Sequence, residues 1–303
     1  MKTPQISVPK LAHALGIANE LWLKREDKHH YGSHKGRSIP LMMSEARKEG
    51  ARSFVISSSG NAAIAAIEAV AASNKNNPQE PVRLTIFVGE KIDPTKWETI
   101  KQKSQGNESI QISQVKNPKQ TAFQAAKVGA TWLRQSTSEI ALLGYEELAT
   151  ELAKIPELAA IFIPTSSGTT ALGLYQGCQK LKINPQIHII QTSTCHPIVQ
   201  EINGQDKMNE RNGNEKPTEI SLASAIVDHV ALRKKEVAEA VKKSNGSGWI
   251  ASNDAIRSAQ KIVHEAIGVD LSPNSALSIV GLIEAQKNQC LPKGALVCLV
   301  TGP

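Results

Sequence analysis

The chain has 303 residues, of which 40% are hydrophobic and 21% charged, and its formal net charge is +7. These values fit a globular protein of two domains, and no apolar run approaches the roughly 18 residues of a membrane span. The first residues lack the apolar core of a signal peptide, so we expect a cytoplasmic protein. The few aromatic residues are not interleaved with basic ones, which argues against nucleic-acid binding.

Strand-like and helix-like segments alternate along the first half of the chain. Apolar or alternating runs predict strands at 21–24, 53–57, 82–88, 110–115 and 131–134. Between and after them, the pattern predicts helices at 61–72, 94–103, 118–128 and 144–153.

The second half continues the same alternation. Strands are predicted at 161–164, 186–192 and 295–300, and helices at 169–181, 235–243, 253–267 and 275–287. Continuous apolar strands that alternate with helices are typical of parallel sheets covered on both faces. The predicted fold is therefore α/β, with mostly parallel sheets in α/β/α layers. The polar stretch 203–216 predicts a mobile surface loop, as a simple excursion, a lid or an oligomer contact.

Cysteine and histidine do not suggest a disulfide framework or a metal centre. The four cysteines have no paired spacing, and we expect buried, reduced thiols at Cys178, Cys195, Cys290 and Cys298. His29, His30 and His34 lie close in sequence, but no cysteine pair or carboxylate completes a metal site there. His29 and His30 are neighbours and would point apart in an extended segment.

The segment Gly32-Ser33-His34-Lys35-Gly36-Arg37 is the most informative motif of the chain. It places a lysine in a Gly/Ser-rich loop at the predicted start of a helix. An amine near a helix N-terminus and other cations loses its proton more easily, and a neutral amine attacks carbonyl carbons. Lys35 is therefore a candidate for covalent chemistry, although a solvated lysine is the commoner use of such a loop.

Three hydroxyl-rich or glycine-containing loops follow predicted strands. The loop 57–63 and the loop 164–170 each open a helix, where backbone N–H groups and small hydroxyls suit a carboxylate or a phosphate. Each is equally well explained as a helix cap without a ligand. The third, Thr301-Gly302-Pro303, ends the last strand at the edge where α/β sheets bind ligands.

Together, a reactive lysine, a phosphate cradle and a carboxylate cradle describe the needs of pyridoxal 5'-phosphate (PLP). The cofactor requires an amine for its aldehyde, an anion site for its phosphate and a second anion site for an amino-acid substrate. A nucleotide-binding α/β protein is the weaker alternative, because neither a P-loop ending nor a Gly-x-Gly-x-x-Gly pattern is present.

These motifs resemble those of PLP enzymes of the tryptophan synthase β superfamily (fold type II), most closely the threonine synthase-like branch. Lys24-Arg25-Glu26-Asp27 followed by the lysine segment is similar to the family pattern Lys-x-Glu-Asp and Gly-Ser-Phe-Lys-Asp-Arg. Ser59-Gly60-Asn61 and Thr301-Gly302 match two further motifs. Segments at 144–151, 216–225 and 272–276 also resemble family segments.

The resemblance implies a role for each matching residue. It implies Lys35 as the Schiff-base lysine, Asn61 at the cofactor's phenolic oxygen, and Thr301 at the pyridine nitrogen. It implies a phosphate loop formed by Ser166, Ser167, Gly168, Thr169 and Thr170. It also implies a site for the substrate carboxylate formed by Ser58, Ser59, Gly60, Asn61 and Ala62.

The resemblance further implies two domains, with the cofactor in the cleft between them. Residues 1–40 plus 150–303 would form the larger, PLP-binding domain, and 41–149 the smaller one. It also implies that the protein is a homodimer and that it binds an amino-acid substrate. Neither a membrane nor a nucleic acid is expected as a partner.

The implied activity is a lyase or replacement reaction at Cβ or Cγ of an amino acid. Thr301 is neutral, so it holds a pyridinium less well than a carboxylate would, which favours elimination or replacement over transamination. The substrate stays open between phosphohomoserine, serine, threonine and an activated serine. Phosphohomoserine would require a second anion site for its phosphate, and the sequence indicates no residues for such a site.

Several positions depart from the family pattern. His34 replaces an aromatic residue, Gly36 replaces Asp, and His29-His30 stand where Asn-Pro is common. The phosphate loop has Ser166 and Ser167 where glycines are common, and the chain ends directly after Pro303. A catalytically weak member, or a non-catalytic binding or regulatory protein with this fold, therefore stays an alternative.

Overall fold

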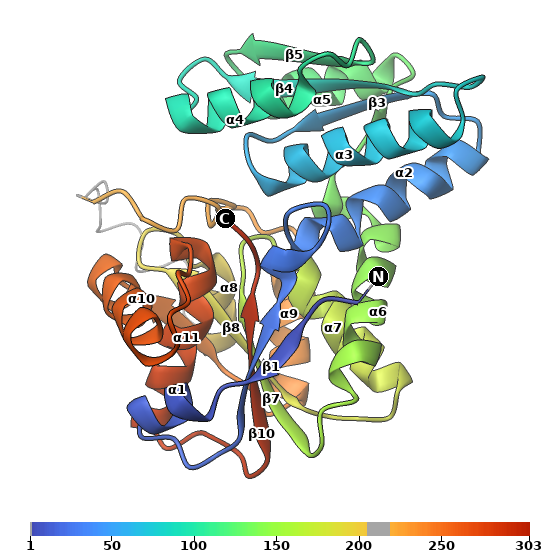
Figure 1. Cartoon of the computed structure of the whole chain (residues 1–303). Helices are drawn as coiled ribbons and strands as arrows, with labels where there is room; N and C mark the ends of the chain where they lie inside the picture. The colour runs from blue at the N-terminus through green and yellow to red at the C-terminus, as the bar shows by residue number, and fades with distance from the viewer. Residues whose placement is uncertain (1, 205–218) are drawn as a thin grey trace. The chain divides into compact units, whose positions relative to one another are not determined.

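The chain forms two compact units in a computed structural model that describes residues 2–204 and 219–303 (Figure 1). The larger unit comprises Met1–Lys28 and Tyr145–Pro303, and the smaller unit comprises His29–Gly144. The domain limits expected from the sequence, at 40 and 150, stay a prediction. The polar stretch expected at 203–216, and part of the family-like segment 216–225, lie outside the described residues.

The larger unit is built on a six-stranded sheet in the order β1-β2-β10-β7-β8-β9. Strand β1 runs antiparallel to β2, whereas the other neighbouring strands are parallel. The strands are β1 (Gln5–Ser7), β2 (Leu21–Arg25), β7 (Leu158–Pro164), β8 (Gln186–Thr192), β9 (Gly248–Ala251) and β10 (Ala295–Val300). All six residues of the central strand β10 are buried, as expected for a strand covered on both faces.

Helices cover both faces of this sheet. On one face α11 lies across β7, β8, β9 and β10, and α10 and α1 pack beside it in one apolar cluster. On the other face α7, α8 and α9 contact β8. The helices are α1 (Pro9–Ala14), α7 (Thr169–Lys180), α8 (Pro197–Asn203), α9 (Lys234–Lys243), α10 (Asn253–Ile267) and α11 (Pro273–Lys287).

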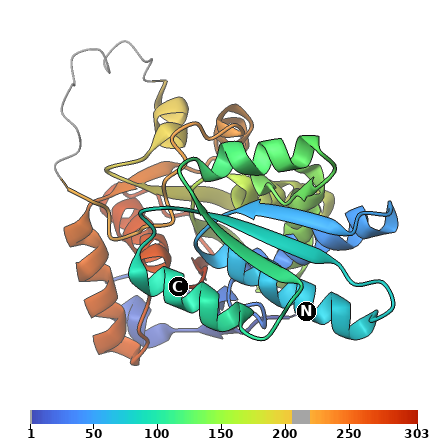
Figure 2. The same ribbon diagram turned by 90° about the horizontal axis from the view of Figure 1, so that it is seen from above.

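The smaller unit has a four-stranded parallel sheet in the order β5-β4-β3-β6. Its strands are β3 (Ser53–Ser57), β4 (Arg83–Gly89), β5 (Ile110–Val115) and β6 (Thr131–Trp132). Helices α2, α3 and α4 pack on one face, and α5 lies on the other, as Figure 2 shows for α4 and α5. These helices are α2 (Ile39–Lys48), α3 (Asn61–Asn76), α4 (Pro94–Ser104) and α5 (Pro118–Lys127).

Helix α6 (Glu139–Leu152) runs across the limit between the two units. It begins five residues before the helix predicted at 144–153, and the strand predicted at 131–134 is limited to two residues. The helix expected after the Lys35 loop is α2, whose bounds the sequence did not predict. Among the described strands and α-helices, β1, α1, α8 and β9 have no predicted counterpart. No helix in the described parts of the chain is long and apolar enough to cross a membrane.

Three of the four thiols are buried, as expected. Burial raises the pKa of Cys178 to about 12 and that of Cys195 to about 11, and it also raises the pKa of Cys298. The expectation is wrong for Cys290, which is exposed in the loop that follows α11. In this loop the thiol donates a hydrogen bond to the Asn288 carbonyl at 3.2 Å, and the neighbouring Leu291, not Cys290, packs against the core.

Candidate active site

The lysine segment folds into a compact turn of the smaller unit. The short 3-10 helix η1 (Glu26–Lys28) precedes it, and Lys35 lies on a second one, η2 (His34–Arg37), which leads into α2. The Ser33 hydroxyl accepts a hydrogen bond from the Lys35 backbone N–H at 3.3 Å, as an N-cap residue does. Lys35 is half-buried, between the buried residues His34 and Gly36.

Two residues far along the sequence hold the chain directly after Lys35. Gly144 of α6 approaches so closely that a Cβ there would lie 2.2 Å from the Arg37 carbonyl oxygen. The Gln135 side-chain amide donates a hydrogen bond to the Ser38 hydroxyl. Sequence reasoning missed Gln135, and it included Gly144 only as the first residue of a family-like helix, because a contact between positions about a hundred residues apart leaves no local pattern.

The two histidines before the turn do not point apart, so that expectation is wrong. The rings of His29 and His30 stack with centroids 4.9 Å apart and an angle of 23° between their planes. The cause is a turn in place of an extended segment, closed by a hydrogen bond of 2.7 Å from the Gly32 N–H to the His29 carbonyl. Among the described residues, no three His, Cys, Asp or Glu side chains converge as a metal site.

The predicted carboxylate loop lies beside the lysine turn. Residues 58–60 follow β3, and Asn61 is the first residue of the 16-residue helix α3. Gly60 is the N-cap and makes no side-chain cap hydrogen bond, so the helix start offers backbone N–H groups and a positive dipole end. Helix η2 contacts α3, and a Cβ on Gly32 would lie 3.8 Å from Ile64 in its first turn. The structure therefore brings the turn of Lys35 and the start of α3 together.

The predicted phosphate loop belongs to the larger unit and joins β7 to α7. Gly168 is the N-cap of the 12-residue helix, with φ +88° and ψ −7°, a conformation that favours glycine. The hydroxyls of Ser167 and Thr169 are hydrogen-bonded at 3.1 Å. The Ser166 hydroxyl accepts from the backbone N–H groups of Val227 and Asp228, each at 3.3 Å. The loop thus combines hydroxyls with the N-terminus of a helix.

Thr301 is buried directly after β10, also in the larger unit. Two serines near the start of α11 hold the next residue: the Ser272 hydroxyl donates to the Gly302 carbonyl at 2.6 Å, and that of Ser275 donates to it at 3.0 Å. The Gly302 N–H donates back to the Ser275 hydroxyl at 3.2 Å. The segment 272–276, recognised from its resemblance, therefore supports the backbone that carries Thr301.

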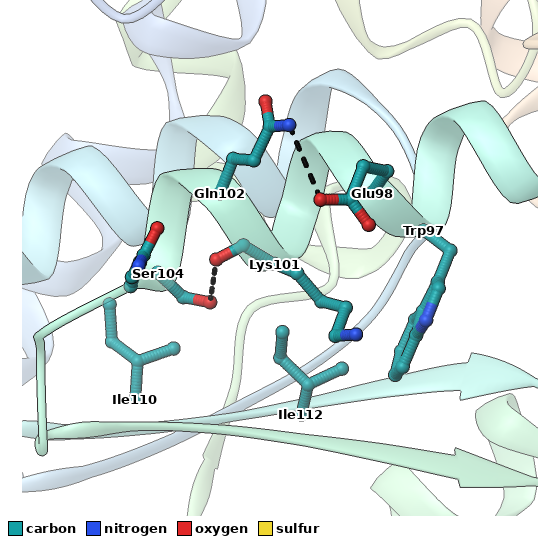
Figure 3. Close-up of a pocket in the computed structure, with 8 residues that line it drawn as sticks. Trp97, Glu98, Lys101, Gln102, Ser104, Ile110 and Ile112 are labelled. Carbon is teal, nitrogen blue, oxygen red and sulfur yellow. Dashed lines mark hydrogen bonds between the residues drawn. The ribbon is translucent and has the colours of Figure 1, made fainter.

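A surface hollow of about 490 Å³ lies elsewhere on the smaller unit, between α4 and β5 (Figure 3). Its lining includes Trp97, Lys101, Ile110 and Ile112, with the Lys101 amine 5.3 Å from the centre of the Trp97 ring. None of the predicted site residues lines it. It therefore does not belong to the candidate active site.

Comparison with known proteins identifies the family. The family model described as pyridoxal-phosphate dependent enzyme matches residues 1–302. The chain belongs to this family. Threonine synthase of Methanocaldococcus jannaschii is 24% identical over 99% of the chain and 74% of its own length. Threonine synthase of a Synechocystis species is 25% identical over 99% of the chain and 75% of its own length.

Solved structures show the same fold at low sequence identity. Serine racemase of maize matches the whole chain with a TM-score of 0.81 at 17% identity, over 88% of its own length. Threonine deaminase isoform 2 of Solanum lycopersicum matches the whole chain with a TM-score of 0.80 at 18% identity, over 84% of its length. The predicted fold class, α/β with mostly parallel sheets as in fold type II, is confirmed.

The residues of the candidate site fit PLP, the cofactor of this family. The loop at 166–170 presents hydroxyls and a helix start whose N-cap, Gly168, makes no side-chain cap hydrogen bond, and these suit a phosphate dianion bound by hydrogen bonds and a helix dipole. A second, longer helix starts at Asn61 beside the turn of Lys35, and it suits the carboxylate of an amino acid. Each unit thus contains one helix start whose chemistry suits an anion.

Proposed function

We propose that this enzyme is a PLP-dependent lyase that eliminates or replaces a group at Cβ or Cγ of an amino acid, in the manner of threonine synthase. The observation that carries the proposal is the packing of the lysine turn on the first turn of α3. It puts a candidate nucleophile and base next to a candidate carboxylate site within one unit.

In the smaller unit, Lys35 has two proposed roles. Its amine would hold the cofactor through the aldehyde carbon. When not bound there, the amine would act as the general base that accepts the Cα proton of the substrate. The N–H groups and hydroxyls of 58–62 hold the substrate carboxylate, and the Asn61 amide donates to the cofactor's phenolic oxygen.

In the larger unit, residues 166–170 are proposed to hold the cofactor phosphate. The hydroxyls of Ser167, Thr169 and Thr170 and the start of α7 supply the donors, while Ser166 also ties the loop to the segment at 227–228. When bound, PLP supplies an electron-withdrawing ring that stabilises negative charge at Cα.

The proposed partner of the ring nitrogen is the Thr301 hydroxyl, which is neutral. A neutral partner makes the ring withdraw electrons less strongly than a carboxylate partner would. Loss of a leaving group from Cβ, which the electron pair at Cα expels directly, would then compete well against transamination, whereas a leaving group at Cγ would also require removal of a proton from Cβ. This argument favours elimination or replacement, and it supports a substrate such as phosphohomoserine, serine, threonine or an activated serine.

Product analysis tests the proposal. The protein with PLP is incubated with each candidate amino acid, and we expect release of a 2-oxo acid, or of phosphate with phosphohomoserine. Lys35→Ala should lose this activity, whereas Lys48→Ala, which alters an exposed lysine of α2, should keep it. Inversion at Cα with no loss of the leaving group would contradict the lyase assignment and indicate a racemase. Cofactor binding without turnover would favour the non-catalytic alternative.

A further inference from the structure

We propose that His29 is a positioning residue for Lys35 and that it forms a matched pair with Gly36. The inference rests on the proposed attachment of the cofactor to Lys35. The His29 side chain is 6% exposed although it carries a polar imidazole, and it belongs to the same unit as Lys35. The two departures from the family pattern, His29 and Gly36, are then explained together by the contact between them.

The His29 ring occupies the space that a side chain at position 36 would need. A Cβ on Gly36 would lie 2.3 Å from Nδ1 and 2.4 Å from Cε1 of His29, and 2.7 Å from Cβ of Tyr31. These distances are far below van der Waals contact. Gly36 does not have a positive φ, so its backbone conformation does not require glycine. The requirement for glycine comes from the His29 ring, which makes the two closest contacts, and from the Cβ of Tyr31.

The ring itself is held by its own backbone. The Tyr31 N–H donates to His29 Nδ1 at 3.2 Å, and the Gly32 N–H donates to the His29 carbonyl at 2.7 Å. The ring also stacks on the ring of His30. Because these contacts fix the ring, it cannot move away to make room for a side chain at position 36.

The residues on both sides of Lys35 are therefore held in place. On one side Ser33 accepts the Lys35 backbone N–H, and on the other side the His29 ring confines Gly36. Together these contacts set the direction in which the Lys35 side chain leaves the turn. If His29 only filled space in the core, its replacement would change the stability of the protein. The reactivity of Lys35 in the folded protein would then stay the same.

The readout is the rate at which PLP attaches to Lys35, trapped by borohydride reduction and located by peptide mapping, with thermal unfolding measured in parallel. Gly36→Ala should slow attachment about tenfold or more, since small displacements of a reacting group are costly. Gly89→Ala is the matched control in the same unit, because a Cβ there meets nothing within 4 Å. It should attach the cofactor at the wild-type rate.

Rescue separates positioning from packing. Adding His29→Ala to Gly36→Ala removes both ring atoms that would lie within 2.4 Å of the new Cβ, while the Tyr31 Cβ at 2.7 Å stays in place. This double variant should therefore attach the cofactor at least about threefold faster than Gly36→Ala alone. Adding His29→Asn should rescue less, because an asparagine oxygen that accepts the Tyr31 N–H takes the place of Nδ1, 2.3 Å from that Cβ.

Three outcomes overturn the inference. If borohydride does not trap PLP on Lys35 of the wild type, the assignment of the lysine fails, and this inference fails as well. If PLP is trapped on Lys35 of the wild type but folded Gly36→Ala attaches it at the same rate, or adding His29→Ala gives no rescue, positioning fails and the lysine assignment stands. If Gly36→Ala does not fold, the single variants decide: His29→Ala should be slower than His29→Asn, and equal rates at the wild-type value would contradict the proposal.

Discussion

Residues that are remote from Lys35 in the sequence contact the turn that contains it. Ser33 caps its short helix locally, but Gln135 and Gly144 hold the residues that follow it. A Gly/Ser-rich loop thus becomes a defined turn because tertiary contacts restrict it on several sides. The sequence motif predicts the reactive residue, whereas the contacts that orient it depend on the folded unit.

Gly168 offers a test of the phosphate loop at the level of one residue. Gly168→Ala would put a Cβ 2.5 Å from the Val237 side chain, at a φ of +88° that alanine rarely adopts. We expect the start of α7 to shift and PLP affinity to fall about tenfold or more, measured by fluorescence titration.

The control for this variant separates strain from the contact with Val237. Gly268→Ala has a similar positive φ, of +66°, at the end of α10, but its Cβ meets nothing within 4 Å. Both variants should lose some stability, whereas PLP affinity should fall in Gly168→Ala and not in Gly268→Ala. Equal affinities in the two variants would contradict the assignment of this loop to the phosphate.

Among the elements, length decided what the sequence could predict. Buried strands of five to seven residues, such as β3 and β8, and long helices, such as α10, carry enough residues for a pattern to appear. Helix α1 has six residues and β9 has four, which is too few for a periodicity. The loops of the candidate site could be predicted because a strand end and a helix start are local features.

The core of the larger unit contains one titratable stack across three strands. The His188 ring on β8 stacks on Phe162 of β7 with centroids 4.6 Å apart, and it accepts a hydrogen bond from Trp249 of β9 at 3.2 Å. Burial lowers the pKa of His188 from 6.5 to about 4. The imidazole is therefore neutral in the folded protein at neutral pH.

This stack predicts a pH dependence of stability. Below pH 6.5 the unfolded chain binds a proton at His188 that the folded chain does not bind until about pH 4, so the free energy of unfolding decreases as pH falls through this window. At pH 5 the loss should be about 2 kcal/mol. In urea unfolding at several pH values, His188→Gln should show a shallower dependence than wild type; equal slopes would contradict the prediction.

At the scale of the whole molecule, the larger unit is assembled from two stretches of chain separated by the smaller unit. A buried ion pair joins them: the Lys24 amine on β2 lies 2.5 Å from the Glu151 carboxylate on α6, and Lys24 also donates to the Thr3 carbonyl at 2.8 Å. The Lys24 side chain is fully buried and that of Glu151 is 6% exposed. Such a pair is costly to break because the remaining charge stays buried.

Glu151→Ala should therefore lower the free energy of unfolding by about 3–5 kcal/mol. Glu146→Ala is the matched control on the same helix, because Glu146 also lies 2.5 Å from a lysine, the exposed Lys180. It should cost less than about 1 kcal/mol. Replacing both buried partners, as Lys24→Met with Glu151→Leu, should recover most of the loss, and a double variant as unstable as Glu151→Ala would contradict this account.

The central claim is that Lys35 attaches the cofactor. The most direct test is the visible absorption spectrum of the purified protein with PLP, compared with that of Lys35→Ala and of Lys48→Ala. We predict the yellow band of the lysine-bound cofactor in wild type and Lys48→Ala, and its loss in Lys35→Ala. An equal band in Lys35→Ala, or no band in wild type, would contradict the assignment of Lys35.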